Sequence, residues 1–212
     1  MKSAFLMFVM TVLSSTLMSA QQMASFDQIS PFHDGLAAVL KDGKWGFIDA
    51  DRKMVIDYRD DLVADQNCSM DCCTAQKDAK YPKFHFNRAL IKKTIDGITH
   101  YGYIDKSGKT VIQTDFLYAQ PFTKNGAIVV RLYKDGSREN EAIGKRLISY
   151  YYNQEVIDVN GKVSLHLDGP HHMTYSKEHI KQLSKLTAKF LNDNLVAVKV
   201  NNQWELRSLN NE

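Results

Sequence analysis

Apolar and polar positions alternate over short spans along residues 32–56, and turn residues separate the spans. Residues 36–40 form a first apolar run, which the pair Asp42-Gly43 ends. An Asp-Gly pair between two apolar runs is a hairpin signal, because glycine adopts the positive φ angles of tight turns. Residues 44–48 follow as a second run. The pattern therefore predicts a β-hairpin at the start of this stretch.

The second strand of this hairpin leads into a further turn and a third strand. Trp45 and Phe47 share one face of it, while Gly46 lies on the other. A glycine inside a strand marks a place where another backbone or ring approaches closely. Asp49 begins the turn, and residues 54–56 are apolar again. A three-stranded meander of this size needs neighbours to bury its apolar face.

The same pattern returns at residues 101–112, which align with residues 45–56 at a constant offset. Aspartate at the first turn position and glycine at the fourth suit a type I turn with a bulge, so Arg52 is a poorer choice than the aligned Gly108. The aligned signature residues are Trp45 with Tyr101, Gly46 with Gly102, and Asp49 with Asp105. Upstream, we align Phe86, Ala89 and Leu90 with Phe32, Ala38 and Val39.

Two weaker copies follow. The third begins at Phe122, with Gly126 aligned to Gly35 and the pair Asp135-Gly136 as its hairpin turn, and it resumes at residues 156–163. In that copy Gln154 stands at the tryptophan position and Asp158 at the turn. In the fourth copy Trp204 keeps the ring, Glu205 replaces the glycine and the Asp turn is lost.

The run K-W-G-F-I-D, followed by a Gly-Lys turn, V-I and F-x-x-G-L-A-V, resembles the bacterial WG (KWG) repeat family. That family usually has proline after V-I, where this chain has Asp57 and Gln113. The resemblance implies a mainly β protein of tandem hairpin repeats, often exported or attached to other domains, with no general activity or catalytic residues assigned. We place three to four WG-like units near residues 32–56, 86–112, 122–163 and 190–206, within a single domain at residues 21–212.

Residues 1–20 have the organisation of a signal peptide. Lys2 precedes an apolar core at residues 4–13, and small residues lead to a cleavage site after Ala20. The core is shorter than the roughly 20 residues of a membrane-spanning helix, although an uncleaved anchor is the alternative. We expect an exported protein, periplasmic or secreted, with no stable membrane insertion after cleavage. The net charge of +3 with interspersed signs argues against nucleic-acid binding.

Residues 59–83 interrupt the repeats and contain the cysteines Cys68, Cys72 and Cys73. In an oxidising compartment we expect Cys68 to form a disulfide with Cys72 or Cys73, which leaves one thiol that is free or pairs with another chain. A metal site in this loop would need about four ligands, and the nearest histidine is His85. We therefore predict a local disulfide and no metal.

Residues 137–153 form a second insertion, in which we expect a loop at residues 138–145. The β-prone run Tyr150-Tyr151-Tyr152 must place rings on both faces of a strand. One face then belongs to the core, and the other is a candidate binding surface of partly exposed rings.

His166, His171, His172 and His179 cluster near Asp168, a set that zinc or copper can use. Because Gly169-Pro170 indicates a turn, we expect a surface loop with scattered histidines instead.

Residues 176–191 predict an amphipathic helix. Ser176 is a good N-cap, and Glu178 places negative charge in the first turn, where the helix dipole favours it. We expect the apolar face to pack on the sheet and to cap one end of the repeat stack. A membrane-surface or partner-binding helix is the alternative. The residues of the apolar face are Ile180, Leu183, Thr187, Phe190 and Leu191.

The sequence contains no G-x-S-x-G, H-E-x-x-H, phosphate-loop, dinucleotide or paired C-x-x-C motif. The recurring acids Asp49, Asp105 and Asp158 occupy turn corners, which a structural role explains. For the repeated rings Trp45, Tyr101 and Trp204 we expect a core ladder.

We predict a module without catalytic activity or cofactor that binds a protein, or serves as a scaffold, at the cell envelope. It would use strand edges or an aromatic face. A glycan-binding module is the first alternative and requires the repeated rings to be exposed in a row. An envelope hydrolase is the second, and it requires acids and histidines from different units in one cleft.

Overall fold

The computed structural model describes residues 25–64, 80–140, 145–182 and 187–209. Within these ranges the chain is mainly β, as predicted, with antiparallel strands in three sheets and one short helix. The predicted signal peptide at residues 1–20 and the cysteines Cys68, Cys72 and Cys73 lie outside the described residues. Export and disulfide pairing therefore stay predictions.

The first sheet is a meander of four strands, β1 (Gln28–His33), β2 (Leu36–Lys41), β3 (Lys44–Ile48) and β4 (Met54–Arg59). It confirms the three strands predicted for residues 36–56 and adds β1 before them. The hairpin signal is confirmed as well, because Asp42 and Gly43 both have positive φ angles at the turn between β2 and β3.

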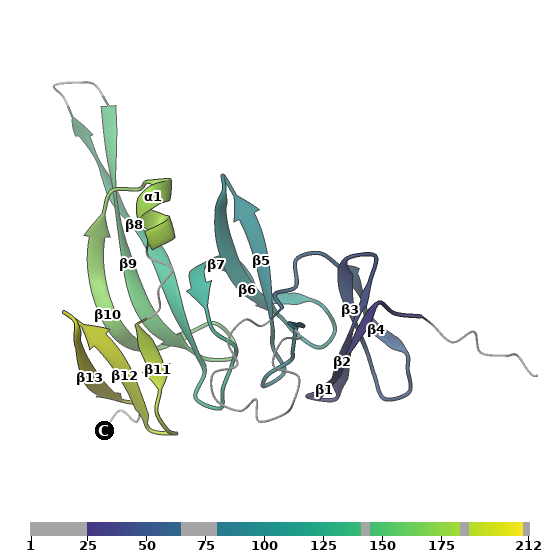
Figure 1. The fold of residues 1–212 in the computed structure, drawn as a ribbon. Helices are drawn as coiled ribbons and strands as arrows, with labels where there is room; N and C mark the ends of the chain where they lie inside the picture. The colour runs from purple at the N-terminus through teal and green to yellow at the C-terminus, as the bar shows by residue number, and fades with distance from the viewer. Residues whose placement is uncertain (1–24, 65–79, 141–144, 183–186, 210–212) are drawn as a thin grey trace, which may run out of the picture.

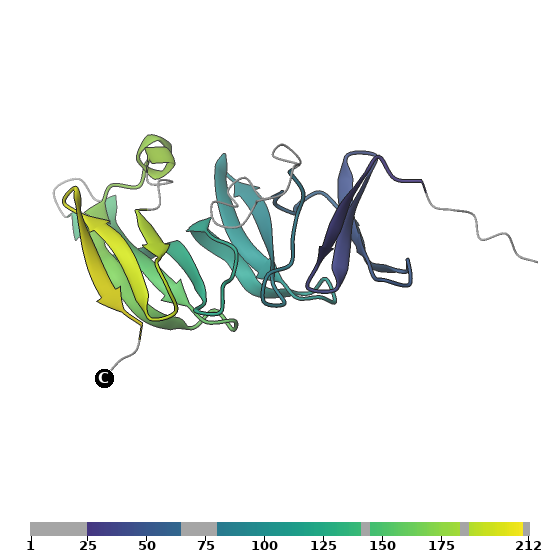
Figure 2. The same cartoon turned by 60° about the horizontal axis from the view of Figure 1, so that its bottom comes forward.

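The second sheet contains six strands in chain order: β5 (Ala89–Ile95), β6 (Ile98–Ile104), β7 (Thr110–Ala119), β8 (Ala127–Asn140), β9 (Lys145–Ile157) and β10 (Val163–Met173). The third sheet contains β11 (Ala188–Phe190), β12 (Leu195–Val200) and β13 (Gln203–Ser208). Figures 1 and 2 show the sheets following one another in chain order along an elongated molecule.

Equivalent hydrogen-bonded positions define four units. Each has a central hairpin, formed by β2–β3, β5–β6, β8–β9 or β12–β13, and a preceding strand segment that pairs with its first strand. In the first three units the hairpin is followed by an Asp turn and a fourth strand, β4, β7 or β10. The long strand β7 serves two units, because its first half pairs with β6 and its second half with β8.

The strand register corrects part of our alignment. Phe84, and not Phe86, is equivalent to Phe32. The residue after Phe32 pairs with Leu36 across a two-residue turn, and the residue after Phe84 pairs with Arg88 in the same way. Ala89 is then equivalent to Ala37, since both pair with the isoleucine that ends the next strand. Gly126 closes its turn at the position of Leu36, not of Gly35. The sequence alignment was wrong because it matched residue types across turns of different composition.

The three Asp turns have the same hydrogen bonds, which supports the structural role predicted for these acids. The Asp49 amide donates to the Lys53 carbonyl, and one Asp49 carboxylate oxygen accepts from the Lys53 amide at 2.9 Å. Asp105 and Asp158 repeat both bonds with Lys109 and Lys162. An aspartate at the corner thus satisfies backbone donors that the turn would otherwise leave unpaired.

The fourth turn position requires glycine for two reasons in the second and third units. Gly108 and Gly161 both have a φ angle of 83°. A Cβ atom on either one would also lie 3.2 Å from an isoleucine of the preceding unit, Ile56 or Ile112. The first unit has no such neighbour among the described residues, so Arg52 meets only the cost of its positive φ angle of 67°.

Replacing Arg52 with glycine is expected to raise the free energy of unfolding by about 0.5–1 kcal/mol, because glycine adopts this φ without strain. Arg52→Ala is the matched control, since alanine also loses the side chain but keeps the strained backbone. Thermal or urea unfolding measures both variants. An equal stability change in the two variants would contradict the backbone explanation.

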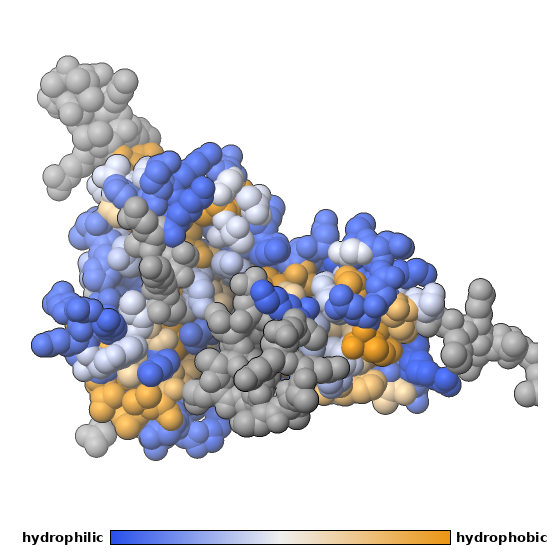
Figure 3. Space-filling model, in the orientation of Figure 1, coloured by the Kyte–Doolittle hydropathy of each residue, from blue (hydrophilic) through white to orange (hydrophobic). Residues whose placement is uncertain are grey.

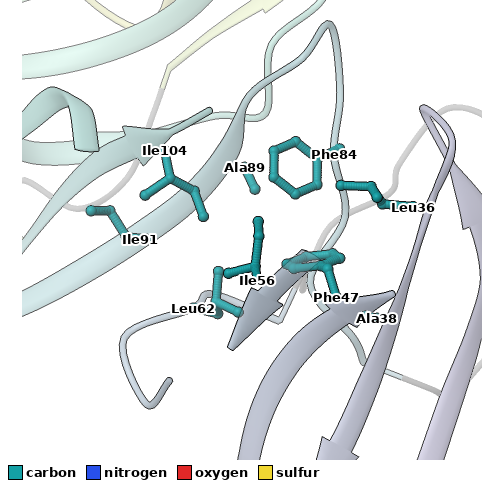
Figure 4. Packing of buried hydrophobic residues seen from close by; sticks show 9 residues of the cluster. All are labelled: Leu36, Ala38, Phe47, Ile56, Leu62, Phe84, Ala89, Ile91 and Ile104. Atoms are coloured by element: carbon teal, nitrogen blue, oxygen red, sulfur yellow. The ribbon is translucent and has the colours of Figure 1, made fainter. Parts of the chain in front are cut away.

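The core lies between the units. One face of the first sheet, with Ala38, Phe47 and Ile56, packs against the second unit through Ala89, Ile91 and Ile104 (Figure 4). The next interface repeats this arrangement: Leu90, Tyr103 and Ile112 meet Ala127, Val129 and Ile157. The third joins Ile128 and Val156 to Val196 and Val198. The second and third units therefore bury one face on their predecessor and the other on their successor, as expected for stacked repeats.

An aromatic contact recurs at these interfaces. Phe84 packs edge-on against Phe47 with ring centroids 4.8 Å apart, and Phe122 packs in the same way against Tyr103 at 4.7 Å. Both phenylalanines are almost fully buried, at 1% and 2% exposure. The equivalent Phe32 of the first unit is 51% exposed, because no described unit precedes it.

The buried glycines of the signature make room for the fourth strand. A Cβ atom on Gly102 would lie 2.6 Å from the carbonyl oxygen of Ile112, and one on Gly46 would lie 2.9 Å from that of Ile56. The ladder register is irregular at both places, so the fourth strand bulges towards the glycine. The predicted close approach of another backbone is confirmed.

The helix prediction for residues 176–191 was largely wrong. α1 covers only Lys177–Gln182, and Ala188–Phe190 is strand β11. The start was predicted correctly, because the Ser176 hydroxyl accepts from the His179 amide. Ile180 of α1 packs with Ile98, so the helix lies beside the second and third units and not at an end of the stack. Pairing with β12 overrides the helical pattern at Phe190.

Two predicted loops are also strands. The pair Asp135-Gly136 does not end β8, and the register shifts there as the strand continues to Asn140, with β9 beginning at Lys145. Only residues 141–144 of the predicted loop lie outside the described chain. Gly169-Pro170 lies inside β10, where the register against β9 also shifts. In both places a bulge accommodates the residues that we had interpreted as a turn.

Candidate functional site

Among the described residues, the fourth unit lacks the fourth strand that the first three units have. In the first three units the second strand of the hairpin pairs with a fourth strand, and an aliphatic side chain there lies opposite the core residue. The pairs are Phe47 with Ile56, Tyr103 with Ile112, and Val156 with Leu165. β13 is the edge of its sheet, and no described strand other than β12 pairs with it.

Apolar side chains are exposed on the face of the fourth unit that, in the first three units, packs on the next unit. Leu206 is equivalent to the buried Phe47 and Tyr103, yet 59% of it is exposed, and Trp204 is 54% exposed. Figure 3 shows apolar surface over the region of β11–β13. Lys189 and Lys199 border the patch: the Lys189 ammonium lies 5.0 Å from the Trp204 ring centroid, and Lys199 pairs directly with Trp204. We call this surface, with the β13 edge, the terminal face.

The opposite end of the stack is built differently. The face of the first sheet that points away from the second unit carries Ala37, Val39 and Ile48, all buried. Phe26 and Tyr58 pack over them, together with Met54. Burial, with the nearby Asp42 and Asp27, raises the pKa of Tyr58 above its usual value. The chain therefore covers this end with its own side chains, while the terminal face has no such cover among the described residues.

A second unusual feature is a buried acid in the third unit. Glu155 pairs with Val129 in the ladder, at the position of the signature glycines Gly46 and Gly102. It is fully buried. One carboxylate oxygen, Oε1, accepts from the Tyr133 hydroxyl at 2.7 Å and from Asn153 Nδ2 at 3.2 Å. The His166 Nδ1 atom lies 3.2 Å from the same oxygen.

The other oxygen of Glu155, Oε2, has no hydrogen-bond partner and lies 4.0 Å from Arg131 Nη1. Arg131 itself stacks on the Phe116 ring, with its guanidinium 4.7 Å from the centroid. Burial and the bond to Glu155 raise the pKa of the Tyr133 hydroxyl, so it stays protonated as a donor. The result is a polar network inside an otherwise apolar repeat interface.

An open groove of about 510 Å³ adjoins this network. His166 and Asn153, which both contact Glu155, line it together with Tyr151 and Asp168. Two more histidines meet acids here: His171 Nε2 lies 2.9 Å from Asp168, and His172 Nδ1 lies 3.7 Å from Asp135. The remaining lining residues are Asp135, Gly169, Pro170 and His172.

The predicted tyrosine run lies beside this groove. Tyr151 stacks on Tyr133 with centroids 5.0 Å apart, and it lines the groove. Tyr150 and Tyr152 point to the other face of the strand, where Tyr152 packs on the core around Ile180. All three rings are half-buried. The rings occupy both faces, as the alternation requires.

The signature rings do not form the ladder that we expected. Trp45 and Tyr101 are partly buried in two different core clusters, and Trp204 is exposed. The recurring buried position lies two residues later, at Phe47, Tyr103 and Val156. Tyr103 is fully buried; its hydroxyl donates to the Gln120 carbonyl, and burial holds its pKa well above the usual value.

The four histidines do not converge. His166, His171 and His172 each meet a different acid, and His179 lies on α1. In the described part of the chain, no three side chains among histidine, cysteine, aspartate and glutamate are arranged to hold a metal ion. The described helix is also neither long nor apolar enough to span a bilayer.

The loss of the fourth Asp turn is visible in the sequence, but the position of β13 at the edge of its sheet was not predicted. Glu155 was not predicted either. The signal was present, because alignment of Gln154 with the tryptophan position places Glu155 on the signature glycine. The other units have a buried glycine at this position, so an acid there indicates a local polar site.

No curated protein and no solved structure matches the chain. The model of the WG containing repeat matches residues 24–45 and 101–134, which confirms the resemblance to the WG repeat family at these two stretches.

Proposed function

We propose that this chain is a non-catalytic repeat module, exported to the cell envelope, that binds a protein partner through its terminal face. The observation that supports this proposal is that, among the described residues, no strand follows β13 and no unit covers its outer face, so that Leu206 and Trp204 are exposed. The signal-peptide pattern of residues 1–20 supports the export part.

The partner would add an extended segment to the edge of β13. In this mode of recognition, main-chain hydrogen bonds supply affinity and alternate side chains supply specificity. The first three units define the chemistry of the segment, because each places an aliphatic side chain opposite the residue equivalent to Leu206. Lys189 and Lys199 beside the patch favour a segment with acidic residues next to that side chain.

The glycan alternative gains no support from this geometry. It requires a row of exposed rings, but Trp45 and Tyr101 are half-buried in separate clusters. The hydrolase alternative requires acids and histidines from different units in one cleft. The acids and histidines that meet in the groove all belong to the third unit.

A synthetic peptide with the sequence of residues 105–114, the turn and fourth strand of the second unit, tests the terminal face. In a Trp45→Phe variant, where Trp204 is the sole tryptophan, we expect the peptide to shift the emission to shorter wavelength as the ring becomes covered. The same peptide with serine at the position of Ile112 should bind at least about tenfold more weakly, since it loses the aliphatic contact.

Leu206→Ser should also abolish the shift, and Ile29→Ser is the matched control, because Ile29 is an exposed aliphatic residue of the first unit. A chain in which residues 208–212 are replaced by residues 105–114 should no longer respond, since its edge is already occupied. An unchanged emission at millimolar peptide, or a response that Leu206→Ser leaves intact, would refute binding at this face.

A further inference from the structure

We propose that the groove of the third unit binds a guanidinium group, presented by a small molecule or by an arginine side chain. This site is separate from the terminal face and has no counterpart in the first two units, where glycine occupies the position of Glu155. The proposal depends on which hydrogen-bonding atoms remain unpaired, on the aromatic wall, and on the balance of charge.

The unpaired buried atoms of this region are acceptors. Asn153 Oδ1 and Glu155 Oε2 are buried and have no hydrogen-bond partner. Asn153 must turn its Nδ2 group towards Glu155 Oε1, because Nδ2 donates hydrogen bonds and a carboxylate oxygen can only accept them. Asn153 Oδ1 therefore points away from Glu155 Oε1. Asn153 lines the groove, and Glu155 lies behind it, with Oε1 against Asn153 and His166 and with Oε2 towards Arg131. A ligand that reaches Asn153 Oδ1 from the groove must bring an N–H donor.

The charge of the site selects a cation. The carboxylates of Asp168 and Asp135 line the groove, each beside a histidine, and that of Glu155 lies behind it, between His166 and the guanidinium of Arg131. Asp168 is mostly buried and is held in place by His171 at 2.9 Å and by Gln154 Nε2 at 3.5 Å. A carboxylate oriented in this way is prepared for a charge-assisted hydrogen bond. An anionic ligand would be repelled by the same groups.

The wall of the groove favours a planar cation over a spherical one. The Tyr151 ring lines the groove, is fixed by stacking on Tyr133 at an interplanar angle of 12°, and meets His172 at 5.9 Å. A guanidinium group lies flat against aromatic rings and has five donors in a rigid plane. Gly169 packs directly on Asn153, because a Cβ atom there would lie 2.5 Å from Oδ1.

Calorimetric or NMR titration of the purified chain with n-butylguanidinium tests the proposal. We expect saturable binding, and we expect n-butylurea, the neutral analogue of the same shape, to bind at least about tenfold more weakly because it lacks the charge. n-Butylammonium should also bind more weakly, since it cannot stack. If acetyl-arginine amide binds as tightly as n-butylguanidinium, the guanidinium group comes from an arginine side chain of a protein. If it binds more weakly, the guanidinium group comes from a small molecule.

Asp168→Asn should weaken n-butylguanidinium binding roughly tenfold. Asp115→Asn, an exposed acid on β7 outside the groove lining, is the matched control and should leave it unchanged. Tyr151→Leu supplies a second test that retains every charge, and thermal unfolding confirms that each variant is folded. Absence of saturable binding, equal binding of the urea, or equal effects of the two aspartate variants would overturn the proposal.

Discussion

Phe122→Ala is expected to lower the free energy of unfolding by about 3–5 kcal/mol, the usual cost of removing a fully buried phenylalanine. The ring lies between the second and third units, 2% exposed and in edge contact with Tyr103. Its removal leaves a cavity at an interface that both units need, and the surrounding strands are held by their hydrogen bonds. The cavity therefore cannot close by a small shift of one side chain.

The repeat itself supplies the control for this experiment. Phe32 occupies the equivalent position in the first unit but is half-exposed, so Phe32→Ala should cost less than about 0.5–1 kcal/mol. Equilibrium urea unfolding of the two variants measures the difference. Similar losses for both would mean that Phe32 is covered in solution, and the first unit would then not be the end of the stack.

Gly102→Ala is expected to cost about 3 kcal/mol, at the upper end of what overpacking a core costs. The new methyl group would lie 2.6 Å from the Ile112 carbonyl oxygen and 2.8 Å from the backbone of Gln113. Those atoms are main chain, held by the pairing of β6 with β7, so the clash is relieved only by separating the two strands. We expect a lower unfolding midpoint and weaker hydrogen-exchange protection in β7.

Two other glycines separate the clash from the general effect of adding a methyl group. Gly43 has a φ angle of 74° and open space around it, so Gly43→Ala should show only the backbone cost of about 1 kcal/mol. Gly46→Ala should fall between the two, because its closest contact is 2.9 Å and its other neighbours are flexible side chains. If Gly102→Ala destabilises no more than Gly43→Ala, steric approach is not the reason for glycine in the signature.

The parts of the fold that depend on a few neighbouring residues could be predicted from the sequence. The Asp42-Gly43 hairpin and the three Asp turns follow from backbone angles and side-chain hydrogen bonds within five residues. The mainly β class followed from the repetition of these local signals. Tertiary pairing decided the places where prediction failed. Residues 188–190 have a helical pattern but pair with β12, and Asp135-Gly136 is a turn signal within a strand that β9 holds extended.

The candidate sites were predictable to a lesser degree. The sequence shows that Glu205 follows Trp204 and that no Asp turn comes after them. That β13 has an unpaired edge can be recognised only by comparison with the strands of the other three units. Glu155 could be aligned with the signature glycine. Its partners could not be identified, because Tyr133 and His166 reach it from two other strands, in a register that bulges determine.

The divided pairing of β7 has a consequence for cooperativity. Since one continuous strand completes the ladder of the second unit and begins that of the third, neither unit can open without disturbing hydrogen bonds of the other. Between the first and second units, the described backbone pairing is limited to one bridge, Leu62 with Ile91, and its two hydrogen bonds. Two side-chain bonds are added: Arg59 donates to the Gly108 carbonyl, and Asp34 accepts from the Asn87 amide. The stability of such a stack is the sum of the free energies of its units and of the interfaces between them, and the second and third units unfold together as one block. Loss of structure should therefore begin at the ends and reach this block last.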